Sequence, residues 1–422
     1  FKIAEKITSV SKRIRILPLP GVKKGGDLSD WFDIAGNSSS KLLQLAENAL
    51  TPSQFIEEHN LDDANQSNHN EDDSEKALNE MNEEFAVVSI GNRISIMRES
   101  TDDYYSKSDF NTLLQNKPEI NDKTRSLWWL SHPERRQYER IDFLPGISTP
   151  AGTFNLWKGF AVKPKGDLED IPKFHELVED VICSDNDSWS KYLWSWLAHI
   201  IQKPYEKPGV AIVLRSDWEG VGKGVFAKYF GSLLGDHFTV VTEGRHLHGN
   251  FNAHQKKCLF LLGGEAVWGG DKRAEAKLKE MITEPTTICE FKGKDSFQIK
   301  SFIRLMLQTN SEWAAPVSLT DRRYFVLDVS EMRLNDHIFF REVENEKKNG
   351  GTEALLNVLQ QFDLTDFEVR DFPDTPARQE QKLLSMQPLE EWWHSVLNNA
   401  DTLIHDRVLN IDEINIVGKK SD

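Results

Sequence analysis

A glycine-rich loop that carries one lysine separates an apolar stretch from an amphipathic one between Gly209 and Tyr229. The run 209–214 is rich in β-branched residues and predicts a buried strand, and the residues from 225 onward predict a helix. A loop in this position can hold a triphosphate, because its N–H groups and the helix N-terminus attract phosphate oxygens and a lysine reaches the terminal phosphates. The loop residues with this predicted role are Gly220, Val221, Gly222, Lys223, Gly224 and Val225.

The loop departs at two positions from G-x-x-x-x-G-K-[ST], the pattern that is typical of phosphate-binding loops. Asp217 occupies the place of the first glycine, and Gly224 occupies the place of the Ser or Thr that would hold Mg²⁺. Glycine-rich turns with a lysine also occur outside nucleotide sites. The loop by itself is therefore equally consistent with an ordinary turn, and the sequence downstream must decide.

A second apolar strand is predicted at Cys258–Leu262, and Glu265 follows it closely. In nucleotide triphosphatases such a strand ends in two acids, one serving Mg²⁺ and the other activating water. Here Gly264 stands at the first of these positions, so Glu265 is predicted to activate water, with a surface turn acid as the alternative. We expect ATP and Mg²⁺ as cofactors, with the metal held through phosphate oxygens and waters because both expected protein ligands are missing.

Two further polar features follow predicted apolar strands. Asn310 comes directly after the apolar stretch 302–309, where its amide can orient an attacking water against a terminal phosphate. Arg322 and Arg323 precede another apolar stretch, 324–327. An always-charged, planar guanidinium suits the stabilisation of a transferred phosphoryl group from a neighbouring subunit.

A predicted hairpin lies between these features. Its strands cover 286–291 and 296–299, and its tip contains Lys292 and Lys294. A basic tip inside the pore of a ring can grip a phosphate backbone. The four tip residues, Lys292–Asp295, are also typical of a solvated turn, so the tip alone does not predict DNA binding.

The composition places the chain among soluble globular proteins and excludes several classes. Its 422 residues carry a formal net charge of −16 and 39% hydrophobic residues, with no apolar run long enough to cross a bilayer. Three widely spaced cysteines without a C-x-x-C pair predict neither a disulfide framework nor a zinc site, and no signal peptide is visible. Between Phe55 and Glu84, eleven acidic residues face one lysine, so the remainder is close enough to neutral to contain a basic channel.

The sequence predicts five segments. Residues 1–50 form the remnant of a larger domain, 51–84 an acidic flexible linker that becomes helical at most from Ser74, and 85–205 a mixed α+β and helical collar. Residues 206–335 form the nucleotide domain and 336–422 a helical C-terminal region. Trp128, Trp129 and Trp157 could stack on bases, but tryptophans flanked by apolar residues favour a core position.

The order of lysine loop, acidic strand, basic hairpin, Asn-ended strand and paired arginines resembles the superfamily 3 helicases, a branch of the AAA+ ATPases. More closely, the chain is similar to the helicase part of primase-helicases from phages, prophages and large DNA viruses. The resemblance covers roughly 85–397 and is carried by segments 132–146, 154–162, 196–214, 250–283 and 308–330. Residues 15–49 also resemble the end of a Toprim-type primase module.

This resemblance implies an α/β fold, a AAA+ P-loop domain preceded by the collar, and an ATP-driven hexameric ring. The ring would move along single-stranded or forked DNA in a bacterial host cytoplasm, without a membrane partner. The implied roles are phosphate binding by Lys223, loop shaping by Gly220 and Gly222, hydrolysis by Glu265, sensing by Asn310, a finger at Arg322 or Arg323, and pore contacts by Lys292 and Lys294.

Two alternatives remain open. Because Gly224 and Gly264 both lack a metal ligand, the chain could be a hexameric DNA-binding scaffold or loader with weak or no ATP hydrolysis. It could also be a small-molecule kinase with a phosphate-binding loop, although the sequence shows neither a lid nor an acceptor site.

Overall fold

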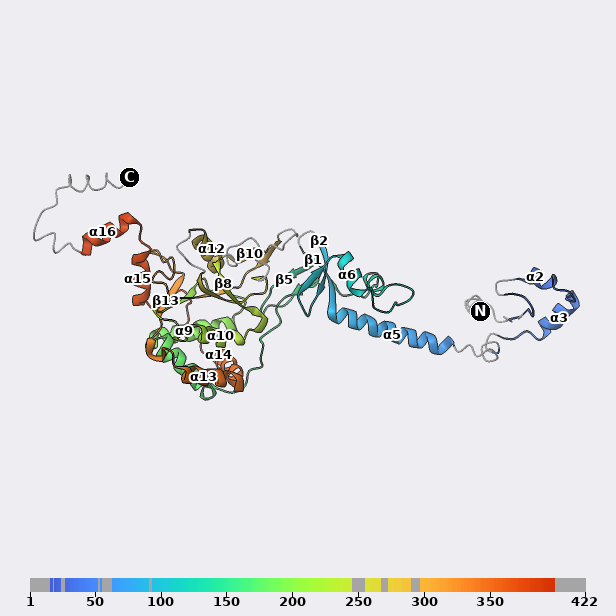
Figure 1. Cartoon of the computed structure of the whole chain (residues 1–422), viewed down its shortest axis with the longest axis horizontal. Helices are drawn as coiled ribbons and strands as arrows, with labels where there is room; N and C mark the ends of the chain where they lie inside the picture. Colours follow the sequence, from blue (N-terminus) through green and yellow to red (C-terminus); the bar gives the residue numbers. More distant parts are fainter. Residues whose placement is uncertain are drawn as a thin grey trace, which may run out of the picture. The chain divides into compact units, whose positions relative to one another are not determined.

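The computed structural model describes residues 16–17, 19–23, 27–51, 54, 63–90, 93–244, 255–266, 272–289 and 297–398. Figure 1 shows the order of its elements along the chain. The chain divides into two compact units whose segments alternate. One comprises Phe1–Phe85, Arg98–Asp103 and Ser108–Arg136, and the other comprises Ala86–Met97, Tyr104–Lys107 and Gln137–Asp422. The predicted boundaries at 205 and 335 therefore fall inside one compact unit.

The first unit is helical. Its helices are α2 (Leu28–Phe32), α3 (Ser39–Glu47), α5 (Asp63–Glu84), α6 (Lys107–Leu114) and α7 (Arg125–Leu130). Where the sequence predicted a flexible linker over 51–84, the structure forms α5 from residue 63 onward. The last turns of α5 bury Ala77, Leu78 and Met81, which share one helix face and supply the apolar contacts that the acidic stretch before them lacks.

The tryptophans of α7 lie in the core of this unit, as favoured from the sequence. Trp129 is fully buried and packs against Phe85 and Phe110, with ring centroids 6.4 and 5.6 Å away. Its indole N–H donates to Asn82 Oδ1 over 2.9 Å. Trp128 is also buried. Neither ring is therefore available to stack on a base.

The second unit is built on a five-stranded parallel sheet in the order β13-β7-β12-β9-β8. The strands are β7 (Ala211–Arg215), β8 (Phe238–Glu243), β9 (Phe260–Ala266), β12 (Arg304–Thr309) and β13 (Tyr324–Asp328). Four of them confirm predicted strands, and β8 was not predicted. The α/β fold class is confirmed by this sheet and its helices.

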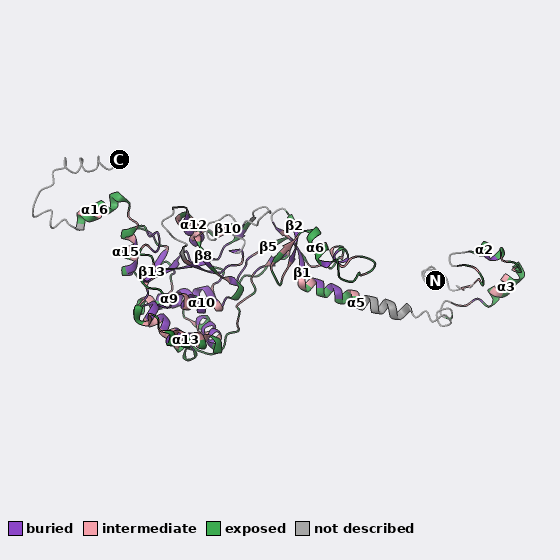
Figure 2. Ribbon diagram, viewed as in Figure 1, coloured by how far each residue is buried: buried purple, intermediate pink, exposed green. Residues whose placement is uncertain are grey.

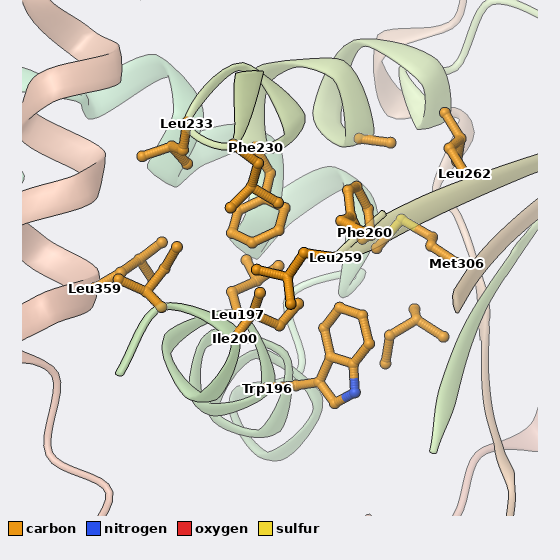
Figure 3. Close-up of a cluster of buried hydrophobic side chains, with 14 of the residues drawn as sticks. Trp196, Leu197, Ile200, Phe230, Leu233, Leu259, Phe260, Leu262, Met306 and Leu359 are labelled. Carbon is orange, nitrogen blue, oxygen red and sulfur yellow. The ribbon is translucent and has the colours of Figure 1, made fainter. Parts of the chain in front are cut away.

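Helices cover both faces of the sheet because its strands are apolar on both sides. Ile212 and Leu214 face a core shared with α9 (Asp187–Gln202), α10 (Lys223–Ser232) and α14 (Thr352–Gln361). Ala211 and Val213 face a second core shared with α12 (Lys272–Thr283). Figure 3 shows part of the first core, in which Phe230 of α10 packs against Phe260 of the central sheet with ring centroids 5.1 Å apart. Each fully buried leucine or phenylalanine stabilises the fold by roughly 1.5–3 kcal/mol.

Smaller sheets complete the unit. β3 (Asp103–Tyr105), β2 (Arg93–Arg98), β1 (Phe85–Ile90) and β4 (Gln137–Tyr138) form one sheet in that order. β5 (Arg140–Asp142) pairs with β6 (Thr153–Asn155) in parallel. β10 (Thr286–Cys289) pairs with β11 (Phe297–Lys300) antiparallel, which confirms the predicted hairpin. Its tip, with Lys292 and Lys294, lies outside the described residues.

The second unit contains further helical elements. They are Leu168–Asp170, α8 (Pro172–Glu176), the π-helical turn Leu177–Ile182, Gly235–His237, Glu331–Arg333, α13 (His337–Glu346), Lys347–Gly351, α15 (Pro376–Leu384) and α16 (Pro388–Asn398). Figure 2 shows that buried residues concentrate in the central sheet and in the helices that contact it. Among the described helices, none is both long and apolar enough to span a bilayer.

Candidate functional site

A cavity of about 430 Å³ lies where β7 and β12 end. All six predicted loop residues line it, together with Asn310, which lies far along the chain. The full lining is Glu219, Gly220, Val221, Gly222, Lys223, Gly224, Val225, Lys228, Gln308, Asn310, Phe340 and Glu344. The sheet order explains this convergence, because β12 pairs directly with β7 and their carboxyl ends meet at one edge.

The loop takes a conformation that requires glycine. Gly220 has φ +81° and Gly222 has φ +109°, both in the left-handed region. A Cβ at Gly222 would also lie 2.8 Å from Cε1 of Phe340 in α13. Helix α10 begins immediately afterwards at Lys223. The first N–H groups of a helix lack intrahelical partners, and here they belong to Lys223, Gly224 and Val225, which all line the cavity.

Replacing Gly222 by alanine is expected to weaken nucleotide binding by at least about tenfold, because strain at positive φ costs of order 1–3 kcal/mol and the methyl group collides with Phe340. The matched control is Gly350→Ala, since Gly350 has φ +101° but open space around it and does not line the cavity. Titration with a fluorescent nucleotide analogue checks this. Equal losses in the two variants would show that Gly222 has no special role in the cavity.

Lys223 connects the loop to both strands. Its side chain is 8% exposed, and Nζ donates to Ser216 Oγ, directly after β7, and to Asn310 Oδ1, directly after β12. Ser216 Oγ in turn donates to the carbonyl oxygen of Trp218 over 2.7 Å. The ammonium group is thus placed by hydrogen bonds between the two strand ends, at the floor of the cavity.

Arg215 anchors the end of β7 next to this serine. Its guanidinium donates to both carboxylate oxygens of Asp328 in β13, over 2.6 and 3.2 Å, and pairs with Glu380 of α15 at 2.9 Å. The hydrogen bond to Asp328 raises the pKa of Arg215 above its ordinary value despite partial burial. A bidentate pair of this kind fixes geometry as well as charge, so the strand that carries Ser216 is held in place.

Gln381 of α15 holds the segment that follows Asn310. Its amide oxygen accepts from Ala314 N over 2.6 Å, and its amide nitrogen donates to Glu312 O over 2.8 Å. The side chain is fully buried, so these bonds are not exchanged for water. Sequence analysis missed Gln381, since nothing local distinguishes it from the other glutamines of this polar helix.

The predicted positions for metal ligands carry no side-chain oxygen, but a neighbouring residue does. Gln308 of β12 lines the cavity, and its buried Oε1 has no hydrogen-bond partner among the described residues. It lies 3.5 Å from where a Cβ of Gly224 would stand. An unpaired amide oxygen at this place fits a hard divalent cation, which takes carbonyl and carboxylate oxygens. Sequence analysis missed Gln308 as well.

Glu265 lies in β9, which extends beyond the predicted strand Cys258–Leu262 to Ala266, rather than in a turn after that strand. Its side chain is outside the described residues. The pairing of β8 with β9 shifts register between Val241 and Glu243, opposite Gly263–Ala266, which indicates a bulge around Gly264 and Glu265. Bulges often redirect a side chain next to an active site.

Arg322 and Arg323 do not line the cavity. They precede β13, whose Tyr324 pairs with Ala211 at the opposite end of β7 from the loop. A five-residue strand spans roughly 17 Å, so the two arginines and Lys223 lie at opposite ends of the strands. Arg323 is tied to the buried Asp321 by its own N–H, over 2.7 Å, and by Nη1, over 3.0 Å. Arg322 is exposed.

A larger cavity, of about 560 Å³, lies between α9 and the segment 362–373. Four carboxylates and one ammonium line it, namely Asp363, Asp366, Glu368, Asp371 and Lys191. A negative lining repels phosphate. Its size therefore does not make it a better candidate than the cavity at Lys223.

Comparison with known proteins supports a shared fold. A family model described as a family of unknown function (DUF5906) matches residues 214–323, a segment that contains the loop, Asn310 and both arginines. The chain is similar to the apo C-terminal region of NrS-1, with 17% identity, a TM-score of 0.61, and coverage of 79% of this chain and 82% of that one. A separate A-form apo structure of that region gives the same values, and another gives 18%, 0.58, 77% and 80%. No curated protein matches.

Proposed function

We propose that this chain is the ATP-driven motor subunit of a ring-shaped DNA helicase of the superfamily 3 type, acting in the replication of a mobile element or virus. The observation that carries the proposal is the cavity in which Lys223 Nζ contacts Ser216 and Asn310 beneath a left-handed glycine loop. A buried ammonium and several helix N-terminal amides in one cavity suit the β- and γ-phosphates of ATP.

The other predicted residues have places in this scheme. Asn310 reaches the same cavity from β12, and β12 pairs with β9, which carries Glu265, so the sensing and hydrolytic residues would act on one terminal phosphate. Arg322 and Arg323 lie at the end of the strands opposite the cavity, where one of them could reach the nucleotide bound by an adjoining copy. In the proposed ring, an arginine of one copy completes the cavity of the next, and Lys292 and Lys294 contact single-stranded DNA in the pore.

The experiment uses the full chain. We expect it to hydrolyse ATP with Mg²⁺, to hydrolyse it several-fold faster with single-stranded DNA, and to unwind a forked duplex. Images of particles with an ATP analogue and an oligonucleotide should show closed rings. Nucleotide binding without DNA-stimulated hydrolysis would contradict the helicase proposal.

A scaffold or loader with weak hydrolysis is the second candidate, and the absence of side-chain oxygens at Gly224 and Gly264 favours it. The two candidates differ in turnover. Ring assembly on DNA with very slow ATP turnover in Mg²⁺ would support the scaffold, and turnover of about 1 s⁻¹ or faster, within the usual range of enzymes, would exclude it.

A further inference from the structure

The cavity contains an unexplained polar atom beside Gly224, one of the two positions that lack metal ligands. We propose that the side-chain amide oxygen of Gln308 is the protein ligand for the divalent cation that accompanies the nucleotide, in place of the missing residues at 224 and 264. This inference rests on the proposed nucleotide function and names the chemistry by which the same site would accept a metal.

The burial of the Gln308 side-chain oxygen argues for a ligand. Its Oε1 is shielded from solvent and, among the described residues, has no hydrogen-bond donor. Buried amide oxygens in folded proteins are almost always paired, because the loss of hydration is otherwise uncompensated. The residue also lines the cavity together with Lys223 and Asn310. A cation bound in the cavity would supply the missing partner.

The position of Gln308 matches that of the missing hydroxyl. An ideal Cβ at Gly224 would lie 3.5 Å from Gln308 Oε1 and 4.0 Å from Nε2. A serine at 224 would carry its oxygen one bond beyond that Cβ, so the glutamine amide lies within the space that such a side chain would use. The chain thus combines a small residue at the start of α10 with a long polar one on the facing strand.

The neighbouring strand supports the same assignment. Leu307 pairs with Gly263, so Gln308 and Gly264 are the next residues along adjacent parallel strands. β12 thus carries Gln308 between β7, which leads into the loop before Gly224, and β9, which contains Gly264. An amide carbonyl is an accepted oxygen ligand for Mg²⁺, which needs only one or two protein ligands when phosphates and waters supply the others.

The test measures ADP and ATP affinity by calorimetry, once with excess EDTA and once with Mg²⁺. We expect Mg²⁺ to tighten binding to the wild-type chain, and Gln308→Ala to reduce that gain by about tenfold while leaving the metal-free affinity unchanged. The matched control is Gln360→Ala on α14, because Gln360 is exposed and outside the cavity. The double variant Gln308→Ala/Gly224→Ser should recover most of the gain, because serine supplies an oxygen from the facing helix.

Each outcome decides between explanations. An unchanged Mg²⁺ gain in Gln308→Ala would overturn the assignment. An equal loss with and without metal would also overturn it, since the amide would then act as a donor to phosphate through Nε2. If the folded wild-type chain binds no nucleotide, the proposed function itself fails, whereas binding that depends on Lys223 but not on Gln308 removes only this inference.

Discussion

Replacement of Lys223 by alanine is expected to lower ATP hydrolysis by at least about 100-fold, the usual cost of removing one charge-stabilising donor from an active site. The ammonium is placed by Ser216 and Asn310 at the floor of the cavity, and alanine leaves no positive group at that position. Nucleotide affinity should also fall, since the charge contacts phosphate in the ground state as well as during transfer.

The matched control is Lys228→Ala. Lys228 lines the same cavity, lies on the same helix and carries the same charge, but its side chain is exposed. We expect this control to change hydrolysis by less than about threefold, since an exposed charge is screened by solvent. Lys223 is buried, so a substitution there can also disturb packing. Methionine keeps most of the volume of lysine, and Lys223→Met therefore separates lost charge from lost packing. Wild-type hydrolysis by the folded Lys223→Met variant would contradict the proposed site.

Local sequence was sufficient to predict the strands that carry the site. The runs before the loop, before Gly264, before Asn310 and after Arg323 are short, apolar and rich in β-branched or aromatic residues, so they predict buried strands in any arrangement. β8 was missed because half of its residues, FTVVTE, are polar and its side chains are largely exposed or half-buried, as on an edge strand of a sheet.

The arrangement of those strands could not be predicted in the same way. That β12 lies between β7 and β9 depends on which helices cover each face, and this order alone brings Asn310 to Lys223. Gln308 and Gln381 were missed for the same reason, since their roles arise from contacts with residues that are distant in sequence. Helix α5 shows the opposite error at its start, because it begins at Asp63, before Ser74, in a stretch whose acidic composition predicted a flexible chain.

The second large effect is expected at the two arginines, which lie at the end of the strands opposite the cavity. Arg322 is exposed and has no hydrogen bond or ion pair to any other residue in the described ranges, whereas Arg323 is tied to Asp321. Arg378 of α15 also fixes this segment by donating to Asp321 O over 2.6 Å. Of the pair, Arg322 is therefore free to reach a neighbouring copy, and Arg322→Ala should reduce hydrolysis by roughly 10³-fold, as for arginines that act in trans. Arg323→Ala should act mainly by loosening the segment around Asp321, to which Arg323 is bound.

Mixed assemblies distinguish action in trans from action within one chain. Lys223→Ala subunits have no working cavity but an intact Arg322, and Arg322→Ala subunits have the reverse. In a random equal mixture, about one quarter of the interfaces combine an intact cavity with an intact arginine, if the ring is head-to-tail. We therefore expect the mixture to recover about a quarter of wild-type hydrolysis although neither parent is active. Because the two groups lie at opposite ends of a strand that spans roughly 17 Å, a mixture as inactive as its parents would leave Arg322 without a route to any phosphate.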